Sequence, residues 1–290
     1  MRILDVIQST AAFFQKKGVE SPRLQIELLL AHHLGLKRLD LYLQFERVLS
    51  GAELAPLREM VKKRAEGIPL QHITGVAPFY GRDFLVSPEV LIPRPETESL
   101  VEETLRKLRG EGGGGETAQS KLLRALDLCT GSGAIGITLA LECPTVEIVA
   151  VDISETALQM ARSNAGKWLD QCERVRLIRS DLFDSVEGIF DCVVTNPPYV
   201  ASGVIPTLSR EVGHDPVLAL DGGPDGLEVI RRIVSRAGEF LTPQGWLLME
   251  IGHDQGAQAL KLCEEAGFQE CRVIADLNGL DRIVTARKAD

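Results

Sequence analysis

Asn196, Pro197, Pro198 and Tyr199 form the segment whose residue types point most directly to chemistry. A planar NH2 group on an amide or a nucleobase has a delocalised lone pair, so its nitrogen is a poor nucleophile, but it offers two N–H donors. The Asn196 side-chain oxygen and the Pro197 carbonyl can each accept one of them, and Tyr199 can stack on the flat group. Such acceptors would orient the nitrogen and stabilise positive charge developing on it. The segment therefore predicts a site of group transfer to a planar nitrogen.

A glycine-rich turn earlier in the chain predicts a second component of the same site. Gly131, Gly133 and Gly136 form a G-x-G-x-x-G pattern after an apolar run, and Asp152 ends the next run. Such glycines let the backbone approach a ligand, and the acid can bind ribose hydroxyls, so a nicotinamide-dependent oxidoreductase would show the same pattern. Asp127, an acid in the apolar run just before this turn, would repel a pyrophosphate and attract a cationic ligand. Together with the Asn-Pro-Pro-Tyr segment, this favours S-adenosylmethionine as the cofactor.

The elements that must position these residues alternate between apolar runs and helical stretches. We expect strands at 122–128, 147–151, 175–179 and 190–195, with helices at 135–142 and 155–169. This alternation is typical of an α/β protein with a doubly wound parallel sheet, whose ligands bind beyond the carboxyl ends of the strands. The Asn-Pro-Pro-Tyr segment directly follows the fourth strand. Both predicted components should therefore meet at one edge of the sheet.

The first part of the chain has a different periodicity and predicts a separate domain. Residues 1–74 show helical spacing, with Ser21 before Pro22 as one helix start and a capping-box pair, Ser50 and Glu53, at another. Residues 75–95 are expected to form a hairpin linker and 96–290 the larger α/β domain. The stretch 111–120 contains four consecutive glycines and is predicted to be a surface loop without a catalytic role.

Composition narrows the class of protein further. Among 290 residues, 32 are Lys or Arg and 41 are Asp or Glu, giving a net charge of -9, the wrong sign for gripping a phosphate backbone. The six cysteines form no C-x-x-C pair, and neither they nor the five histidines have metal-ligand spacing, so we expect reduced thiols and no metal. No stretch approaches the roughly 20 apolar residues of a membrane span, nor is there a signal peptide, so a cytoplasmic protein is expected.

Nearly the whole sequence resembles one family, the HemK/PrmC protein-(glutamine) methyltransferases. Besides Asn196 to Tyr199, the resemblance is carried by LIPRPETE (91–98), ALDGGPDGL (219–227) and DLNGLDRIVTARK (276–288). It implies a Rossmann-like class I S-adenosylmethionine-dependent methyltransferase domain, preceded by a small all-α bundle that helps dock the substrate. The implied reaction is methylation of the glutamine side-chain amide in the Gly-Gly-Gln motif of class I peptide chain release factors. The implied partner is thus a protein, and the enzyme is expected to be a monomer.

The resemblance also assigns roles to individual residues. It places Asp152 on the cofactor ribose, Asp181 and Leu182 beside the adenine, and Asn196 in contact with both ligands. The implied cofactor loop comprises Cys129, Thr130, Gly131, Ser132 and Gly133, and the implied substrate residues are Asn196, Pro197, Pro198 and Tyr199, of which Asn196, Pro197 and Tyr199 are the catalytic candidates.

Two positions depart from the family pattern. Cys129 stands where glycine is usual, which requires that its φ be negative. Asp215 stands where glutamate is common, and we assign it no role, as with Arg94 and Glu96.

Two other enzyme classes and one non-enzyme remain as alternatives. A DNA or RNA amino-methyltransferase uses the same Asn-Pro-Pro-Tyr chemistry, but it should have a basic cleft with stacking aromatics, whereas this chain is acidic and only 5% aromatic. An NAD-dependent oxidoreductase is a more remote alternative. A non-catalytic adaptor would be expected to lose the loop glycines or Asn196, and this sequence keeps them.

Overall fold

The protein consists of two compact units in the computed structural model, which describes residues 1–110, 122–169 and 174–290. One unit comprises Met1–Val76 together with Ser209–His214, and the other comprises Ala77–Leu208 and Asp215–Asp290. The predicted glycine-rich loop at 111–120 and Cys172 lie outside the described residues.

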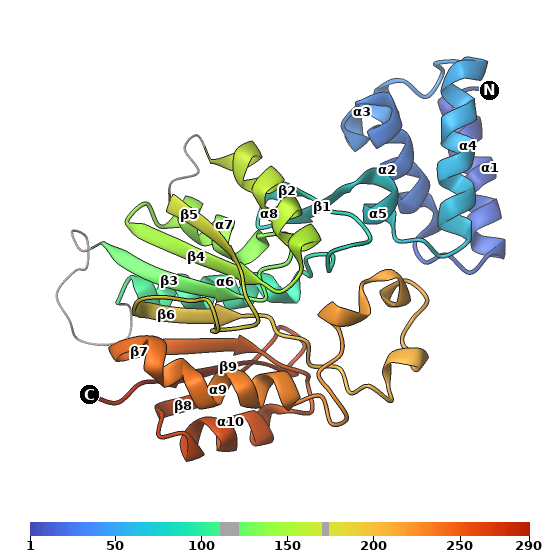
Figure 1. Ribbon diagram of the computed structural model, residues 1–290. Coiled ribbons are helices and arrows are strands. Elements are labelled where there is room, and N and C mark those ends of the chain that lie inside the picture. Colours follow the sequence, from blue (N-terminus) through green and yellow to red (C-terminus); the bar gives the residue numbers. More distant parts are fainter. Residues whose placement is uncertain (111–121, 170–173) are drawn as a thin grey trace. The chain divides into compact units, whose positions relative to one another are not determined.

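The smaller unit is helical (Figure 1). Its core is made of apolar side chains such as Phe14, Leu30 and Leu57, which the helices bury against one another. The predicted capping box is present, since Ser50 Oγ accepts from Glu53 N and the Glu53 carboxylate accepts from Ser50 N. Its helices are α1 (Ile3–Lys16), α2 (Pro22–Leu34), α3 (Arg38–Leu43), α4 (Gly51–Ala65) and α5 (Leu70–Thr74).

A buried arginine ties this unit together. Arg64 on α4 is almost fully buried and donates to the Gln25 side chain at 2.8 Å and to the Ile68 carbonyl at 3.2 Å. It also forms an ion pair with Glu211, which belongs to the short segment Ser209–His214. Because a buried guanidinium is costly unless its donors are paired, this arrangement fixes the segment within the helical unit.

A two-stranded sheet of β1 (Val76–Phe79) and β2 (Arg82–Leu85) follows the helices. The Asn164 side chain accepts from Leu85 N at 2.7 Å, and its amide nitrogen donates to the carbonyls of Leu85 and Ser132 at 2.9 Å. One buried amide therefore joins β2 to the glycine-rich turn.

The larger unit is built on a seven-stranded sheet with the order β5-β4-β3-β6-β7-β9-β8 (Figure 1). The strands from β5 to β7 are parallel, and β9 is antiparallel to both β7 and β8. The α/β prediction is thus confirmed, although the last two strands make the sheet mixed. The strands are β3 (Leu123–Leu128), β4 (Val146–Asp152), β5 (Val175–Arg179), β6 (Phe190–Thr195), β7 (Leu241–Glu250), β8 (Gln269–Ala275) and β9 (Asp281–Arg287).

Helices cover both faces of this sheet, which explains the apolar runs of its central strands. Along β3, Ala125 packs in the cluster that includes α6 and α7, whereas Leu126 packs in the cluster that includes α9 and α10. None of the helices in the described ranges is long and apolar enough to cross a membrane. The helices are α6 (Glu96–Leu108), α7 (Ala134–Glu142), α8 (Glu155–Trp168), α9 (Glu228–Phe240) and α10 (Gly256–Glu265), with short 3-10 turns at Ile205–Thr207, Val212–His214 and Val217–Ala219.

Replacing the buried arginine should destabilise the helical unit. We expect Arg64→Ala to lower the free energy of unfolding by about 2–3 kcal/mol. The substitution leaves the Gln25 and Ile68 acceptors without a donor and removes the ion pair with Glu211. The exposed neighbour Lys63 gives the matched control, and Lys63→Ala should change stability by less than about 0.5 kcal/mol. Urea denaturation followed by circular dichroism measures both. Equal stability of the two variants would contradict this role of Arg64.

Candidate active site

The parallel register of three central strands brings the predicted site residues to one edge of the sheet. Leu128 at the end of β3 pairs with Val151 of β4 on one side and with Thr195 of β6 on the other. The residues that follow these positions are the glycine-rich turn, Asp152 and Asn196. A pocket of about 470 Å³, which we call the strand-end pocket, is lined by Cys129 and Gly131 of this turn and by Asp152 and Asn196.

The structure brings most, but not all, of the predicted residues into this pocket. Its lining includes Cys129, Gly131, Asp152, Asp181, Leu182, Asn196 and Pro198. Thr130, Ser132 and Gly133 do not line it. The first two are buried beneath the turn, and Gly133, with φ 81°, packs against Ala161 where the turn enters α7. Pro197 is buried and Tyr199 half-buried, and neither lines the pocket.

Asp152 both fixes the turn and faces the pocket. Its carboxylate accepts from Gly131 N at 2.8 Å and from Ser154 N at 2.9 Å, one bond to each oxygen. Each oxygen keeps a further lone pair, so the carboxylate can still accept from two ligand hydroxyls. Burial raises the pKa of Asp152 above its ordinary value. Asp152 can therefore bind a ligand that carries two neighbouring hydroxyl groups, as the predicted ribose does.

Asp127 has a role that the sequence analysis did not anticipate. It is fully buried and does not line the pocket, so it does not face a bound cation. Its Oδ2 accepts from Thr130 Oγ1 at 2.6 Å and from Gly136 N at 3.0 Å. A Cβ on Gly136 would lie 2.9 Å from that oxygen, which explains the third glycine of the pattern. Burial raises the pKa of Asp127 to about 7, and the carboxyl group acts as an internal clamp on the turn.

The backbone of Cys129 corrects one expectation. A negative φ was expected, but φ is 58°, in the left-handed region that favours glycine. The turn demands this conformation because Thr130 N must donate to Val151 O and Gly133 N to Thr130 O. A cysteine here bears a strain of about 1–2 kcal/mol that a glycine would avoid. Leu182, also in the pocket, has φ 48° and is similarly strained.

The lining of the pocket also contains apolar side chains and one ion pair. Ile153, Leu182 and Leu218 are among the apolar residues that line it, and flat aromatic groups pack well against such walls. Asp181, predicted to lie beside an adenine, has its Oδ2 paired with Arg232 at 2.8 Å. Arg232 lines the pocket and was not identified from the sequence.

The charge of the lining separates the two cofactor classes that the sequence left open. Four carboxylates line the pocket, those of Glu89, Asp152, Asp181 and Asp221, against the single guanidinium of Arg232. A pyrophosphate would be repelled by this excess, whereas a cationic sulfonium and an amino group would be attracted. Within the described parts of the chain, no cluster of three or more His, Cys, Asp or Glu side chains could hold a metal ion.

The loop Asn196–Tyr199, which we call the acceptor loop, presents two unfilled oxygen acceptors. Asn196 is half-buried and its Nδ2 donates to Thr97 Oγ1 at 3.2 Å, which leaves its Oδ1 for other partners. Among the residues that the structure describes, no donor is bound to Asn196 Oδ1 or to the Pro197 carbonyl. Asn196 lines the pocket. The acceptor loop therefore offers two unfilled oxygens, of which that of Asn196 belongs to a residue that lines the pocket.

The backbone of the acceptor loop is held by the segment 219–227. Val200 N donates to Leu220 O at 2.9 Å, and Gln255 Nε2 bridges the carbonyls of Tyr199 and Gly226 at 2.9 and 3.1 Å. A Cβ on Gly222 would lie 2.8 Å from the Pro198 carbonyl, so this close approach requires glycine. The glycines of ALDGGPDGL therefore shape the acceptor loop without lining the site themselves.

Glu250 was not identified from the sequence, and Asp215 was assigned no role. Glu250, at the end of β7, accepts from Tyr199 OH at 3.1 Å and from Thr97 Oγ1 at 2.6 Å. Its signal was an acid inside the apolar run LLMEI, where burial of a carboxylate needs a reason. Asp215 is buried and pairs with Arg94, so it holds the stretch before α6 in place.

Both the N-terminal part and the larger part of the chain match known families, and similar proteins align over nearly its whole length. Residues 5–75 match the family model described as PrmC N-terminal domain, and 116–212 match the methyltransferase small domain. A release factor glutamine methyltransferase from Geobacter sulfurreducens is 40% identical over 98% of this chain and 96% of its own length. One of the same name from Chlorobaculum tepidum is 41% identical over 97% of this chain and 95% of its own.

Solved structures share the fold of the larger unit. A methyltransferase from Pyrococcus furiosus has a TM-score of 0.53 at 18% identity, covering 73% of this chain and 91% of that one. A 16S rRNA methyltransferase from T. thermophilus, in complex with AdoMet and guanosine, has a TM-score of 0.51 at 20% identity, covering 73% of this chain and 49% of its own.

The strained turn gives a prediction at Cys129. Cys129→Gly should change stability by no more than about 1 kcal/mol, because relief of the left-handed strain offsets the greater freedom of glycine in the unfolded chain. Cys129→Val, which is β-branched, should cost about 2 kcal/mol or more. Thermal denaturation compares the two. If the valine variant is as stable as wild type, then φ at this position is negative in solution.

Proposed function

This chain belongs to the release factor glutamine methyltransferase family, and on that premise we propose that it methylates a glutamine side-chain amide in class I peptide chain release factors. The acceptor would be the glutamine of the Gly-Gly-Gln motif, and the methyl donor S-adenosylmethionine. The full-length identity of about 40% to relatives of that name supports the proposal.

The observation that carries the proposal is the unfilled side-chain oxygen of Asn196 at the pocket, followed in the chain by the unfilled carbonyl of Pro197. A glutamine amide has two N–H groups on one planar nitrogen, and Asn196 Oδ1 and the Pro197 carbonyl can accept one each. The bond from Asn196 Nδ2 to Thr97 holds the NH2 group on the Thr97 side of the amide, so Oδ1 is the atom on the opposite side. Next to Asn196 Oδ1, the acceptor loop therefore favours a nitrogen that donates hydrogen bonds and disfavours a carbonyl or other oxygen that only accepts them.

The cofactor would lie in the strand-end pocket, whose residues fit it. Asp152 would bind the ribose hydroxyls, and Leu182 and Ile153 would pack against the adenine. The carboxylates of the lining match the positive charge of the molecule. When bound, S-adenosylmethionine supplies an electrophilic methyl group on sulfur.

The residues of the chain then accelerate transfer by position and electrostatics. Two acceptors hold the amide nitrogen still and favour a pyramidal geometry, which frees its lone pair. As the nitrogen gains positive charge, the dipoles of the Asn196 and Pro197 carbonyl groups stabilise it. The amide nitrogen becomes strongly acidic only once it carries the methyl group, so its proton passes to solvent water after transfer, and no base has to act before the methyl group moves.

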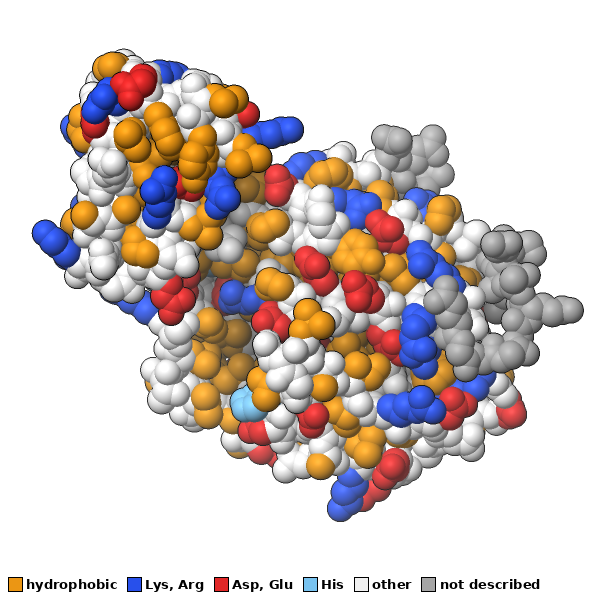
Figure 2. Space-filling view, turned by 180° about the vertical axis from the view of Figure 1, so that it is seen from behind, with side chains coloured by type: hydrophobic (Ala, Val, Ile, Leu, Met, Phe, Trp, Pro, Cys, Tyr) orange, Lys and Arg blue, Asp and Glu red, His pale blue; other side chains and the backbone are white. Residues whose placement is uncertain are grey.

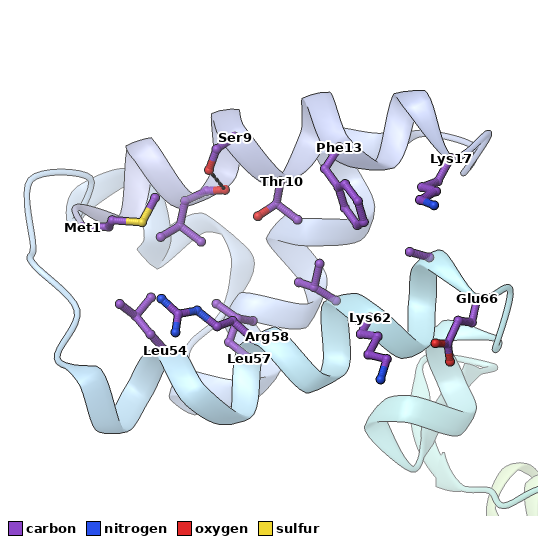
Figure 3. A pocket seen from close by; sticks show the side chains of 13 residues that line it. Met1, Ser9, Thr10, Phe13, Lys17, Leu54, Leu57, Arg58, Lys62 and Glu66 are labelled. Atoms are coloured by element: carbon purple, nitrogen blue, oxygen red, sulfur yellow. Dashed lines mark hydrogen bonds between the residues drawn. The ribbon is translucent and has the colours of Figure 1, made fainter.

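The helical unit would dock the release factor, and its surface offers one groove suited to this. The groove is about 420 Å³ and lies between α1 and α4, with Phe13 and Leu57 among its apolar residues (Figure 3). Lys17, Arg58 and Lys62 line it and are exposed, and none has an ion-pair partner among the described residues. Hydrophobic and basic side chains lie side by side on this unit (Figure 2). Charge complementarity therefore favours an acidic, partly apolar surface on the release factor.

The cell compartment, the lack of nucleic-acid binding and the oligomeric state are part of the same proposal. A protein that modifies release factors would work in the cytoplasm, and all five cysteines for which the structure gives a state are free thiols. The net charge of -9 argues against direct binding of nucleic acid. We propose that the enzyme acts as a monomer, because the acceptor loop and the strand-end pocket belong to one compact unit.

Incubation with a recombinant release factor and labelled S-adenosylmethionine tests the reaction directly. We expect one methyl group on the glutamine of the Gly-Gly-Gln peptide, located by mass spectrometry. Asn196→Ala should lower turnover about 100-fold or more while leaving cofactor affinity within about threefold, because a contact made mainly in the transition state is lost. Methyl transfer to RNA or DNA in place of the peptide would overturn the proposal.

Docking on the groove is tested by reversing its charge. The double variant Arg58→Glu with Lys62→Glu should raise KM for an intact release factor about 10-fold without changing kcat, because attraction at the rim becomes repulsion. A short Gly-Gly-Gln peptide, which lacks the rest of the release-factor surface, should be methylated by the double variant as by wild type.

Two controls make this test specific. Lys63→Glu reverses one charge, half the change in the double variant, on an exposed neighbour that does not line the groove, and Leu43→Ser alters an 86% exposed side chain on α3. Both should leave KM within about twofold of wild type. If Lys63→Glu raises KM as much as the double variant does, net charge and not the groove governs binding.

A further inference from the structure

A buried carboxylate and a buried hydroxyl are hydrogen-bonded to the acceptor loop, and neither lines the strand-end pocket. Glu250 is 1% exposed and Thr97, in the first turn of α6, is 4% exposed. Thr97 Oγ1 lies 2.6 Å from Glu250 Oε2 and 3.2 Å from Asn196 Nδ2. Tyr199 OH lies 3.1 Å from the other carboxylate oxygen. The four side chains form one chain of hydrogen bonds that ends at the acceptor loop.

The chemistry of the end group decides the direction of every bond in this chain. Glu250 accepts from both hydroxyl groups, one on each carboxylate oxygen, so the single hydrogen of the Thr97 hydroxyl is given to Glu250. The Thr97 oxygen can then only accept from Asn196, and Asn196 must turn its NH2 group towards Thr97. Its Oδ1 is left facing the other way, as the proposed acceptor of the substrate N–H.

We propose that Glu250 and Thr97 are positioning residues that fix the orientation of the Asn196 amide, so that its oxygen and not its nitrogen meets the substrate. The proposal deepens the proposed function and rests on it. Without this constraint, the amide could rotate by 180° about its last bond at little cost, since oxygen and NH2 have nearly the same shape. A rotated amide would present a donor to a donor and repel the glutamine nitrogen.

The energetics of the site support a role beyond packing. A buried carboxylate is costly, and no Lys or Arg is ion-paired with Glu250 within the described part of the chain. Burial raises the pKa of Glu250, and its surroundings include Arg282 on β9 and Glu96 on α6 as well as the two hydroxyl donors. An apolar residue or a glutamine would fill this place with less cost. The hydrogen bonds from Asn196 to Thr97 and from Thr97 to Glu250 can keep this direction only if the residue at position 250 accepts the Thr97 hydrogen.

The decisive experiment removes one hydroxyl and keeps its volume. Thr97→Val should lower kcat for release-factor methylation about 10- to 100-fold, with KM and cofactor affinity within about threefold, because Asn196 loses its fixed orientation but not its place. Thr97→Ser retains the hydroxyl and should keep kcat within about threefold of wild type. Thr104→Val is the matched control, since Thr104 is fully buried on the same helix but donates to Leu100 O outside the network.

Glu250→Gln tests the direction of the chain separately from its presence. The glutamine side chain has nearly the same shape, but its NH2 group can donate to Thr97, whose hydroxyl can then donate to Asn196 Oδ1. We expect kcat to fall about 10-fold or more, with a melting temperature within a few degrees of wild type.

The outcomes separate this inference from the function on which it rests. If wild type does not methylate the glutamine, the proposed function fails. If wild type does so and folded Thr97→Val or Glu250→Gln retains wild-type kcat, the function stands and the positioning role is wrong. A fall in kcat for Thr104→Val equal to that for Thr97→Val would also refute it, because it would show a general effect of repacking α6.

Discussion

The site depends on the hydrogen-bonded register of three parallel strands. Leu128, Val151 and Thr195 pair across β4, β3 and β6, so whatever follows these residues must emerge at the same edge. Thr195 Oγ1 adds a side-chain bond to Leu128 O at 2.9 Å, which ties β6 to β3 at that edge. A slip of the register by one residue would turn Asp152 or Asn196 to the other face of the sheet. The parallel ladder therefore sets the distance between cofactor pocket and acceptor loop.

Two buried acids then convert this scaffold into a shaped site. Asp127 clamps the glycine-rich turn from within, and Glu250 anchors the hydroxyls of Thr97 and Tyr199 behind the acceptor loop. Each lies in an apolar strand where a neutral residue would cost less. Neither lines the strand-end pocket. Burial of these two carboxyl groups lowers the stability of the fold, but their hydrogen bonds fix the orientation of the turn and of the acceptor loop. Such fixed orientation is expected of a preorganised site.

The larger unit holds the proposed chemistry and the helical unit the proposed docking, and their surfaces differ accordingly. The strand-end pocket is lined by four carboxylates and one guanidinium, whereas the groove between α1 and α4 is lined by three cations and Glu66. A chain with a net charge of -9 thus keeps a local basic surface where a protein partner would bind. A cationic cofactor and an acidic protein surface would each meet complementary charge.

The sequence by itself determined the α/β fold, the positions along the chain of the four strands β3 to β6, and the place of the acceptor loop after β6. These follow from local properties: hydrophobic period, glycine spacing and the chemistry of Asn196 and Pro197. Only the tertiary structure decided which loop residues face the pocket, that Cys129 has φ 58°, and that Thr97 and Glu250 meet Asn196. The physical reason is that these features arise from contacts between segments far apart in the chain, and no local pattern encodes the partner of a buried polar group.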